Sequence, residues 1–469
     1  MKNETKTTKK QKTTISRRSF MGATAGVFTI VPASVLAQNR RLSPSDRLNV
    51  AVIGSGGMGN TNANNIAGVK VDPKHRENIV ALCDVDDVRA AETFKQFPKA
   101  ATYRDFRIML EKQKDIDAVI VATPDHTHTV AAMAAMQLGK HVYVQKPLTR
   151  LVSEARLLTE TARKNKVMTQ MGNQGHSGEG VRQICEWIWS GAIGDVQTVH
   201  AWTNRPVWPH GIATRPTDKP PVPSTLDWDL WLGPAPYRDY HPSYLPFSWR
   251  AYWDFGSGAL GDMACHILDP VFMALKLRYP DSVEGNCSTF VSPGASYDKT
   301  VNTETFPRSS IIHYFFPARE GMPPVEVIWY DGGLHPLRPE ELKPDEVMGR
   351  GGSGVIFEGT RGKLMCGTYG DYQTLLPTWK MDYFEQPPQV LPRIEGNHEH
   401  NWAMSCKFGE PACSNFDYSG PLTETVVMGN LAIKYPNQRL HWDGENMKVT
   451  NNTEANDFVQ MHYRQGWQL

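Results

Sequence analysis

The stretch RLNVAVIGSGGMGNTNANNI at 47–66 decides the fold class. Its apolar run at 48–53 predicts a buried strand, and the glycines after it predict a tight turn into a helix. Gly54, Gly56 and Gly59 have the spacing G-x-G-x-x-G. In that pattern the first glycine makes the turn, the second lets the backbone approach a pyrophosphate, and the third lets helix and strand pack closely. The stretch therefore predicts an α/β domain that binds a dinucleotide at a helix N-terminus.

The choice of dinucleotide depends on the next predicted strand, IVALCDVD at 79–86, which ends in Asp84. A carboxylate there accepts hydrogen bonds from the adenosine ribose hydroxyls and repels a 2′-phosphate. The sequence therefore favours NAD over NADP, with Gly57 and Met58 in the turn as further contacts. The alternative is an α/β unit with a glycine turn and no nucleotide.

Two more strand–loop units follow. The segment 117–140 predicts a buried strand, a break at Thr123–Pro124 and an Ala/Met-rich helix, and HVYVQKPLT at 141–149 predicts a strand that stops before Pro147. Strand ends of such a sheet point into the ligand crevice. The predicted cofactor contacts in these units are Thr123, Pro124, His128 and Lys146.

The glycine motif, Asp84, TPDHTH at 123–128 and QKP at 145–147, in this order, resemble the Gfo/Idh/MocA family of NAD(P)-dependent oxidoreductases that act mainly on carbohydrates. The family signature is Glu-Lys-Pro, and Gln145 stands here in place of the glutamate. The resemblance implies an N-terminal Rossmann domain with a doubly wound parallel sheet. It also implies a C-terminal α+β domain with a large open, mostly antiparallel sheet, and a homo-oligomer, either dimer or tetramer.

The expected domains are 45–166 for cofactor binding and 167–469 for substrate binding and oligomerisation. A helix at 152–165 should close the first domain, and KVMTQMGNQGHSG at 166–178 should begin the second with a strand. The segments 325–333, 354–368 and 421–435 resemble the family's antiparallel sheet and returning helix.

The stretch DFGSGALGDMACHILDPVFMAL at 254–275 predicts a helix that presents Asp262 and His266 on one face, four residues apart. The family has an Asp and a His at this spacing beside its active-site lysine. The resemblance therefore implies a catalytic set of Lys146, Asp262 and His266. We expect His266 to be the general base, Asp262 to orient it and bind a neighbouring hydroxyl, and Lys146 to lower the hydroxyl pKa. The alternative is a helix-start aspartate with a core histidine.

Substrate contacts are expected from Gln174 and His176, in the loop that follows the strand within 166–178, and from Trp253. Eight of the thirteen tryptophans lie between Trp187 and Trp253, and indole rings stack on the C–H faces of sugars. The alternatives are a loop histidine with no role, and tryptophans that pack in the core or at a subunit interface.

Residues 1–37 predict a removable signal peptide: a basic region with Arg17 and Arg18, a short apolar run, and a Val-x-Ala ending at Ala37. The paired arginines before Ser19–Phe20 fit a twin-arginine signal. The alternatives are an ordinary secretory signal or a disordered tail. A twin-arginine signal implies a periplasmic protein that folds around its cofactor before export.

Composition argues against several classes of protein. The first 37 residues hold seven basic residues and one acidic residue, so the rest is mildly acidic and gives no reason to expect nucleic acid. Beyond residue 37 we find no apolar run long enough to cross a bilayer. Seven cysteines without C-x-x-C spacing predict free thiols, and H-x-H pairs without a third ligand predict no metal site.

Three functions follow. The first is a dehydrogenase that moves hydride between a sugar or glycoside hydroxyl carbon and tightly bound NAD. The second is a redox-neutral NAD-dependent glycosidase that oxidises transiently and eliminates, but the Cys-Cys-Tyr sequence of that group is replaced here by MGNQGHS at 171–177. The third is a sugar-binding protein without activity, which the presence of Lys146, Asp262 and His266 disfavours.

Overall fold

The structure is a computed structural model that describes residues 47–69, 76–212, 214–288, 304–460 and 462–467. The predicted signal peptide at 1–37 lies outside the described residues. Within them, no helix is both long and apolar enough to cross a membrane.

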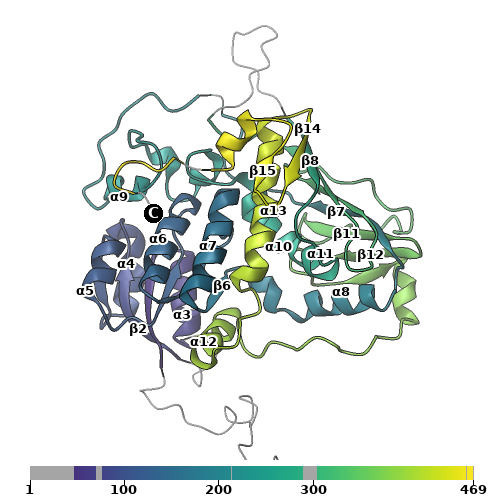
Figure 1. The fold of residues 1–469 in the computed structure, drawn as a ribbon, viewed down its shortest axis with the longest axis horizontal. Coiled ribbons are helices and arrows are strands. Elements are labelled where there is room, and N and C mark those ends of the chain that lie inside the picture. Colours follow the sequence, from purple (N-terminus) through teal and green to yellow (C-terminus); the bar gives the residue numbers. More distant parts are fainter. Residues whose placement is uncertain (1–46, 70–75, 213, 289–303, 461, 468–469) are drawn as a thin grey trace, which may run out of the picture. The chain divides into compact units, whose positions relative to one another are not determined.

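The first half of the described chain forms a six-stranded parallel sheet in the order β3-β2-β1-β4-β5-β6 (Figure 1). Its strands are β1 Asn49–Ile53, β2 Asn78–Cys83, β3 Ala101–Tyr103, β4 Ala118–Val121, β5 His141–Val144 and β6 Thr169–Met171. The helices between them are α3 Met58–Ile66, α4 Asp87–Gln96, α5 Phe106–Lys112, α6 Asp125–Gln137 and α7 Val152–Asn165.

Both faces of this sheet are buried, which explains the continuous apolar runs of its central strands. Along β1, Ala51 and Ile53 pack into one hydrophobic cluster, and Val50 and Val52 pack into another on the opposite face. The same alternation divides β4. The sheet is therefore the doubly wound Rossmann sheet that the sequence predicts.

One expectation about the second domain was wrong. We expected the strand near 166–178 to begin it, but β6 pairs in parallel with β5 and is the sixth strand of the first sheet. All three β6 residues are buried, and Met171 belongs to the same hydrophobic cluster as Val142 and Val144 of β5. The parallel sheet therefore continues past our boundary at 166.

The second sheet has nine strands in the order β13-β12-β11-β7-β10-β9-β8-β14-β15. Its strands are β7 Val196–Trp202, β8 Ser282–Cys287, β9 Ser310–Phe316, β10 Val325–Tyr330, β11 Gly354–Gly359, β12 Gly362–Cys366, β13 Thr374–Leu376, β14 Arg439–Asp443 and β15 Lys448–Val449. Only the β7–β10 pair among these is parallel. This is the large, mostly antiparallel sheet that we expected.

The remaining α-helices of the described chain are α8 Glu179–Trp189, α9 Trp228–Leu232, α10 Gly258–Ile267, α11 Asp269–Ala274, α12 His398–Phe408 and α13 Phe416–Lys434. Helix α13 packs against α7, α10 and β8, and Figure 1 shows it between α7 and the strands β8 and β14. It therefore holds α10 against the parallel-sheet half. All seven cysteines are free.

Candidate active site

A cavity of about 830 Å³ opens at the carboxyl ends of β1, β2, β4 and β5. One side consists of the glycine turn and the strand ends, and the other consists of α10 and the segment before it. Of the residues predicted from the sequence, its lining includes Gly54, Gly56, Gly57, Met58, Asp84, Thr123, Pro124, Lys146, Gln174, Asp262 and His266.

The glycine turn packs so closely against neighbouring backbone that a side chain would not fit at Gly54 or Gly59. Gly54 has φ +82°, and a Cβ on it would lie 2.6 Å from the oxygen of Ala122. Gly59 does not line the cavity; a Cβ there would lie 1.8 Å from the oxygen of Gly54, so its role is close helix–strand packing. Helix α3 begins at Met58 and directs its first N–H groups at the turn.

Asp84 directly follows β2 at the wall of the cavity and is fixed by backbone donors. The N–H of Gly56 donates to Oδ2 at 3.1 Å, and the N–H of Asp86 donates to Oδ1 at 3.0 Å. Burial raises the pKa of this carboxyl. The turn, the helix start and the carboxylate together fit a dinucleotide, with Asp84 placed to hold ribose hydroxyls.

His128 supports the site without lining it. Its Nδ1 lies 2.9 Å from the oxygen of Pro147, and its Nε2 lies 2.9 Å from the oxygen of Thr123. The ring thus connects the loops after β4 and β5. We predicted a cofactor contact, and the structure instead gives this histidine a positioning role, because backbone carbonyls surround both ring nitrogens.

Lys146 meets Asp262 across the cavity. Its ammonium nitrogen donates to Oδ1 of Asp262 at 3.0 Å and to the backbone oxygen of the same residue at 2.6 Å. Lys146 follows β5 in the parallel-sheet half, and Asp262 lies in the second turn of α10. The ion pair therefore joins the cofactor side of the cavity to the side that faces it.

Cations surround the Asp262 carboxylate. Burial alone would raise its pKa, but the charges of Lys146 and Arg250 hold the pKa below the usual value, with a smaller contribution from Arg205. The Arg250 Nε lies 3.5 Å from Oδ1 of Asp262. Asp262 is therefore an anion at neutral pH.

His266 lies one turn further along α10 and is 6 % exposed. Burial and the nearby Lys146 charge lower its pKa to about 3. Its Nδ1 has no hydrogen-bond partner among the described residues. The imidazole is therefore in the neutral form that a base needs, and burial disfavours the imidazolium that it would become on accepting a proton.

The expected pairing of Asp262 with His266 is not what the structure shows. The carboxylate is bonded to Lys146, and no hydrogen bond joins it to His266 in the described part of the chain. The physical reason is charge: a cation attracts the carboxylate far more strongly than a neutral imidazole does. Instead, the edge of Tyr369 packs against the His266 ring, with centroids 5.1 Å apart.

The side chain of Gln145, which replaces the family's glutamate, bonds to helix α3. Its Nε2 donates to Oδ1 of Asn62 in α3 at 2.8 Å, and Asn62 in turn donates to Glu399 at 2.6 Å. The carboxylate that Lys146 contacts is therefore Asp262.

Two of the three predicted substrate residues lie outside this cavity. His176 is buried, with Nδ1 2.9 Å from Oδ1 of Asp269 and its ring against Tyr418. Trp253 lines a different cavity. Loop proximity and tryptophan content indicated these residues but do not specify which way a side chain points. Only Gln174 reaches the active-site cavity.

Sequence reasoning missed many cavity residues, among them Arg205, Arg250 and Tyr369. Arg250 is held by cation–π contacts with Phe247 and Trp249, each 4.2 Å from the guanidinium carbon to the ring centroid. The adjacency of Trp249 and Arg250 in the sequence was the one available signal. Nothing local in the sequence indicates Arg205 or Tyr369.

Two segments of the chain match two models of one family. Residues 48–173 match the oxidoreductase family with an NAD-binding Rossmann fold, and residues 186–289 match that family's C-terminal alpha/beta domain. These two segments are therefore similar, in order, to the two domains of the Gfo/Idh/MocA oxidoreductases, and the first resembles the family's NAD-binding domain.

Curated relatives match over part of their length. The chain is 30% identical over 159 residues to the inositol 2-dehydrogenase of Salmonella typhimurium, which covers 33% of this chain and 45% of the relative. It is 27% identical over 227 residues to the levoglucosan dehydrogenase of Pseudarthrobacter phenanthrenivorans, which covers 47% of this chain and 50% of the relative. The chain thus spans about half the length of these relatives.

The fold is also that of a solved relative. A structure of levoglucosan dehydrogenase in complex with NADH and levoglucosan superposes with a TM-score of 0.56 at 18% identity. The match covers 84% of this chain and 99% of that one. At this identity the likeness concerns the fold.

Proposed function

We propose that this protein is an NAD-dependent carbohydrate dehydrogenase that oxidises a hydroxyl carbon of a sugar or glycoside. The observation that carries the proposal is the convergence of Lys146, Asp262 and His266 on one cavity with the glycine turn and Asp84. The relatives named inositol 2-dehydrogenase and levoglucosan dehydrogenase support a polyhydroxylated substrate.

Alcohol oxidation needs a group that takes the hydroxyl proton while hydride leaves the carbon. Bound NAD⁺ supplies the hydride acceptor. Of the protein's own residues, neutral His266 accepts the proton. The Lys146 ammonium donates a hydrogen bond to the hydroxyl oxygen of the substrate, which favours deprotonation of that hydroxyl. Asp262 holds Lys146 in place, and it accepts a hydrogen bond from a neighbouring hydroxyl.

The export signal proposed at 1–37 implies that the cofactor binds before the protein leaves the cytoplasm. A periplasmic dehydrogenase has no free NAD pool with which to exchange, so its cofactor must enter the fold before export and stay bound. Reoxidation then needs a second substrate or a redox-neutral reaction, and the NAD-dependent glycosidase remains the second candidate for that reason.

The test is to incubate purified protein, without added NAD, with myo-inositol, levoglucosan and simple methyl glycosides. We expect NADH absorbance to appear and a keto sugar to form. A methyl glycoside that is cleaved to the free sugar without net NADH formation would identify the glycosidase instead. Neither change with any of these compounds would contradict both enzyme functions.

A further inference from the structure

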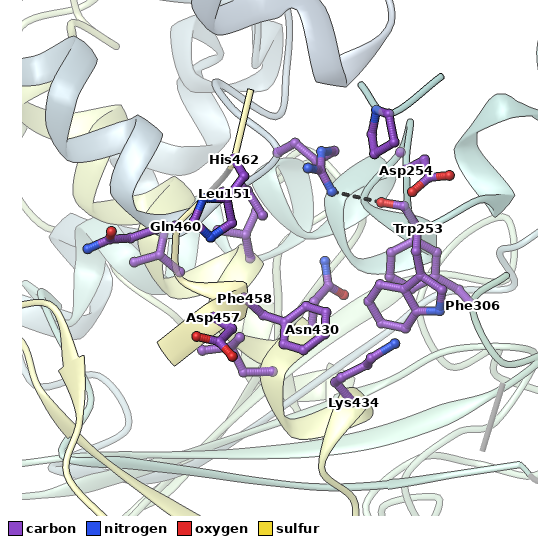
Figure 2. A pocket seen from close by; sticks show the side chains of 16 residues that line it. Leu151, Trp253, Asp254, Phe306, Asn430, Lys434, Asp457, Phe458, Gln460 and His462 are labelled. Atoms are coloured by element: carbon purple, nitrogen blue, oxygen red, sulfur yellow. Dashed lines mark hydrogen bonds between the residues drawn. The ribbon is translucent and has the colours of Figure 1, made fainter. Parts of the chain in front are cut away.

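A second cavity, of about 310 Å³, shares no lining residue with the active-site cavity (Figure 2). It lies beside the end of α13, and we call it the α13 pocket; the residues that define it are Trp253, Phe306, Asn430, Lys434, Asp457 and Phe458. Its volume is at the lower end of the range for small-molecule sites, roughly 300–1,000 Å³. The proposed reaction uses none of these residues.

Aromatic rings form two walls of the α13 pocket. Trp253 packs on Phe306 with centroids 3.7 Å apart, and Phe458 lies across from them, with Asn430 between (Figure 2). The ammonium nitrogen of Lys434 is 4.9 Å from the ring centroids of both Trp253 and Phe458. A cation therefore sits between two aromatic faces at the side of the pocket.

The polar groups of the pocket have unused hydrogen-bonding capacity. Asn430 is 9% exposed; its Nδ2 donates to the oxygen of Ser257 at 3.2 Å, and its Oδ1 has no partner among the described residues. Lys434 forms no ion pair with any described residue, and burial lowers its pKa. Buried polar atoms are normally paired, so the Asn430 oxygen lacks a donor that a ligand could supply, and the partly buried Lys434 ammonium beside it can donate to the same ligand.

The charged and aromatic residues that line the α13 pocket indicate the class of ligand that it would bind. Asp254 and Asp457 line the pocket together with the cations Arg150 and Lys434, so its lining has no formal net charge and favours a neutral ligand over a polyanion. A purely apolar ligand would leave Asn430 and Lys434 without partners, at a cost for each. A ring with apolar C–H faces and several hydroxyl groups satisfies both the aromatic walls and the separated polar atoms.

We propose that the α13 pocket is a second carbohydrate-binding site, which holds one neutral saccharide unit apart from the active site. The sugar's C–H face lies against Phe458. One hydroxyl donates to Oδ1 of Asn430, and another accepts from Nζ of Lys434.

The test uses the full protein with its bound NAD and measures binding of methyl β-glucoside, methyl α-mannoside and cellobiose by calorimetry. The variants are Lys434→Met, which keeps the apolar stem, and Phe458→Ala. Both avoid Asn430, which also holds the backbone of Ser257. The matched control is Lys276→Met, since Lys276 also lies over a tryptophan ring, that of Trp189, but outside the pocket.

We expect at least one of the sugars to bind, each pocket variant to weaken that binding about tenfold, and the control to leave it unchanged. No binding by any of the sugars would overturn the proposal. Binding that survives both pocket variants, or that only Asp262→Asn removes, would also overturn it, because it would then belong to the active site. Binding that depends on Lys434 in a protein unable to reduce its NAD would refute the dehydrogenase and leave this site standing.

Discussion

The ammonium nitrogen of Lys146 lies 3.0 Å from Oδ1 of Asp262, and this ion pair connects the end of β5 to α10. The two side chains are 17% and 9% exposed, so water screens the pair only in part. Removing one partner of a buried pair leaves the other charge uncompensated, which costs about 3–5 kcal/mol when burial is complete. The pair therefore both organises the cavity and sets the charge at its centre.

Asp262→Asn should lower kcat/KM by about 10²–10⁴-fold while bound NAD remains, because the change disturbs Lys146 and not the glycine turn. Steady-state kinetics and the dinucleotide released on denaturation measure the two effects. Asp417→Asn is the control, since Asp417 forms an exposed ion pair with Arg163 outside the cavity. Equal losses in the two variants would show that the Lys146–Asp262 pair has no special role.

The pH profile of kcat/KM should lack an acid limb from His266 near pH 6.5. Its folded pKa of about 3 keeps the imidazole neutral, and so able to act as a base, down to about pH 5. The profile is measured for the wild type and for His266→Gln. A limb near pH 6.5 that disappears in the variant would mean that His266 is hydrated rather than buried.

Stability should fall as the pH drops below about 6.5. Burial lowers the pKa of His266 and His398 to about 3, and of His126 and His210 to about 4. Between those values and the unfolded pKa the unfolded chain binds more protons, so the free energy of unfolding rises with pH and is lost on acidification. Calorimetry should show a lower Tm at pH 5 than at pH 7, with part of the fall opposed by buried Asp331, whose pKa is raised to about 7; a higher Tm at pH 5 would contradict the burial of these rings.

Gly54→Ala should abolish NAD binding, because the added Cβ meets the Ala122 oxygen at 2.6 Å and φ is +82°. Gly139→Ala is a matched control: its φ is +72°, but nothing lies within 4 Å of a Cβ there. The control should cost about 1 kcal/mol of stability and keep its NAD. Dinucleotide content after denaturation measures the difference, and full NAD in Gly54→Ala would place the phosphates elsewhere.

Replacing Arg17 and Arg18 by lysine should leave the protein in the cytoplasm with its signal uncleaved, because the twin-arginine route requires the arginine pair. Fractionation of cells, with the mature N-terminus expected near Gln38, checks this. Unchanged export of the double variant would indicate the ordinary secretory route and would remove the argument for cofactor loading before export.

The periodicity of apolar residues and the spacing of the glycines predicted the strands and the cofactor-binding turn of the Rossmann domain well. The β1 run, Gly54 and Asp84 are close in the sequence, and their chemistry is fixed by the strand–turn–helix that contains them. The misplacement of β6 has a different cause: only three residues pair there, which is too short a run for the pattern to show which sheet the strand joins.

The roles of residues that depend on how a side chain is oriented in the folded protein could be predicted only in part. The helical spacing of Asp262 and His266 placed them on one side of α10, but it could not show that Lys146 takes the carboxylate. Trp253 and His176 were selected by residue type, and packing turned one toward the α13 pocket and the other toward Asp269. Arg205 enters the cavity from a loop with no recognisable pattern.

The most direct test of the central claim is single-turnover reduction of the bound NAD by a sugar that the wild type oxidises, compared with Lys146→Met and His266→Gln. We predict that both variants retain NAD and that the rate of NADH formation falls by about 10²–10⁴-fold in each. Near-normal hydride transfer in both variants, with NAD still bound, would contradict the assignment of this cavity as the active site.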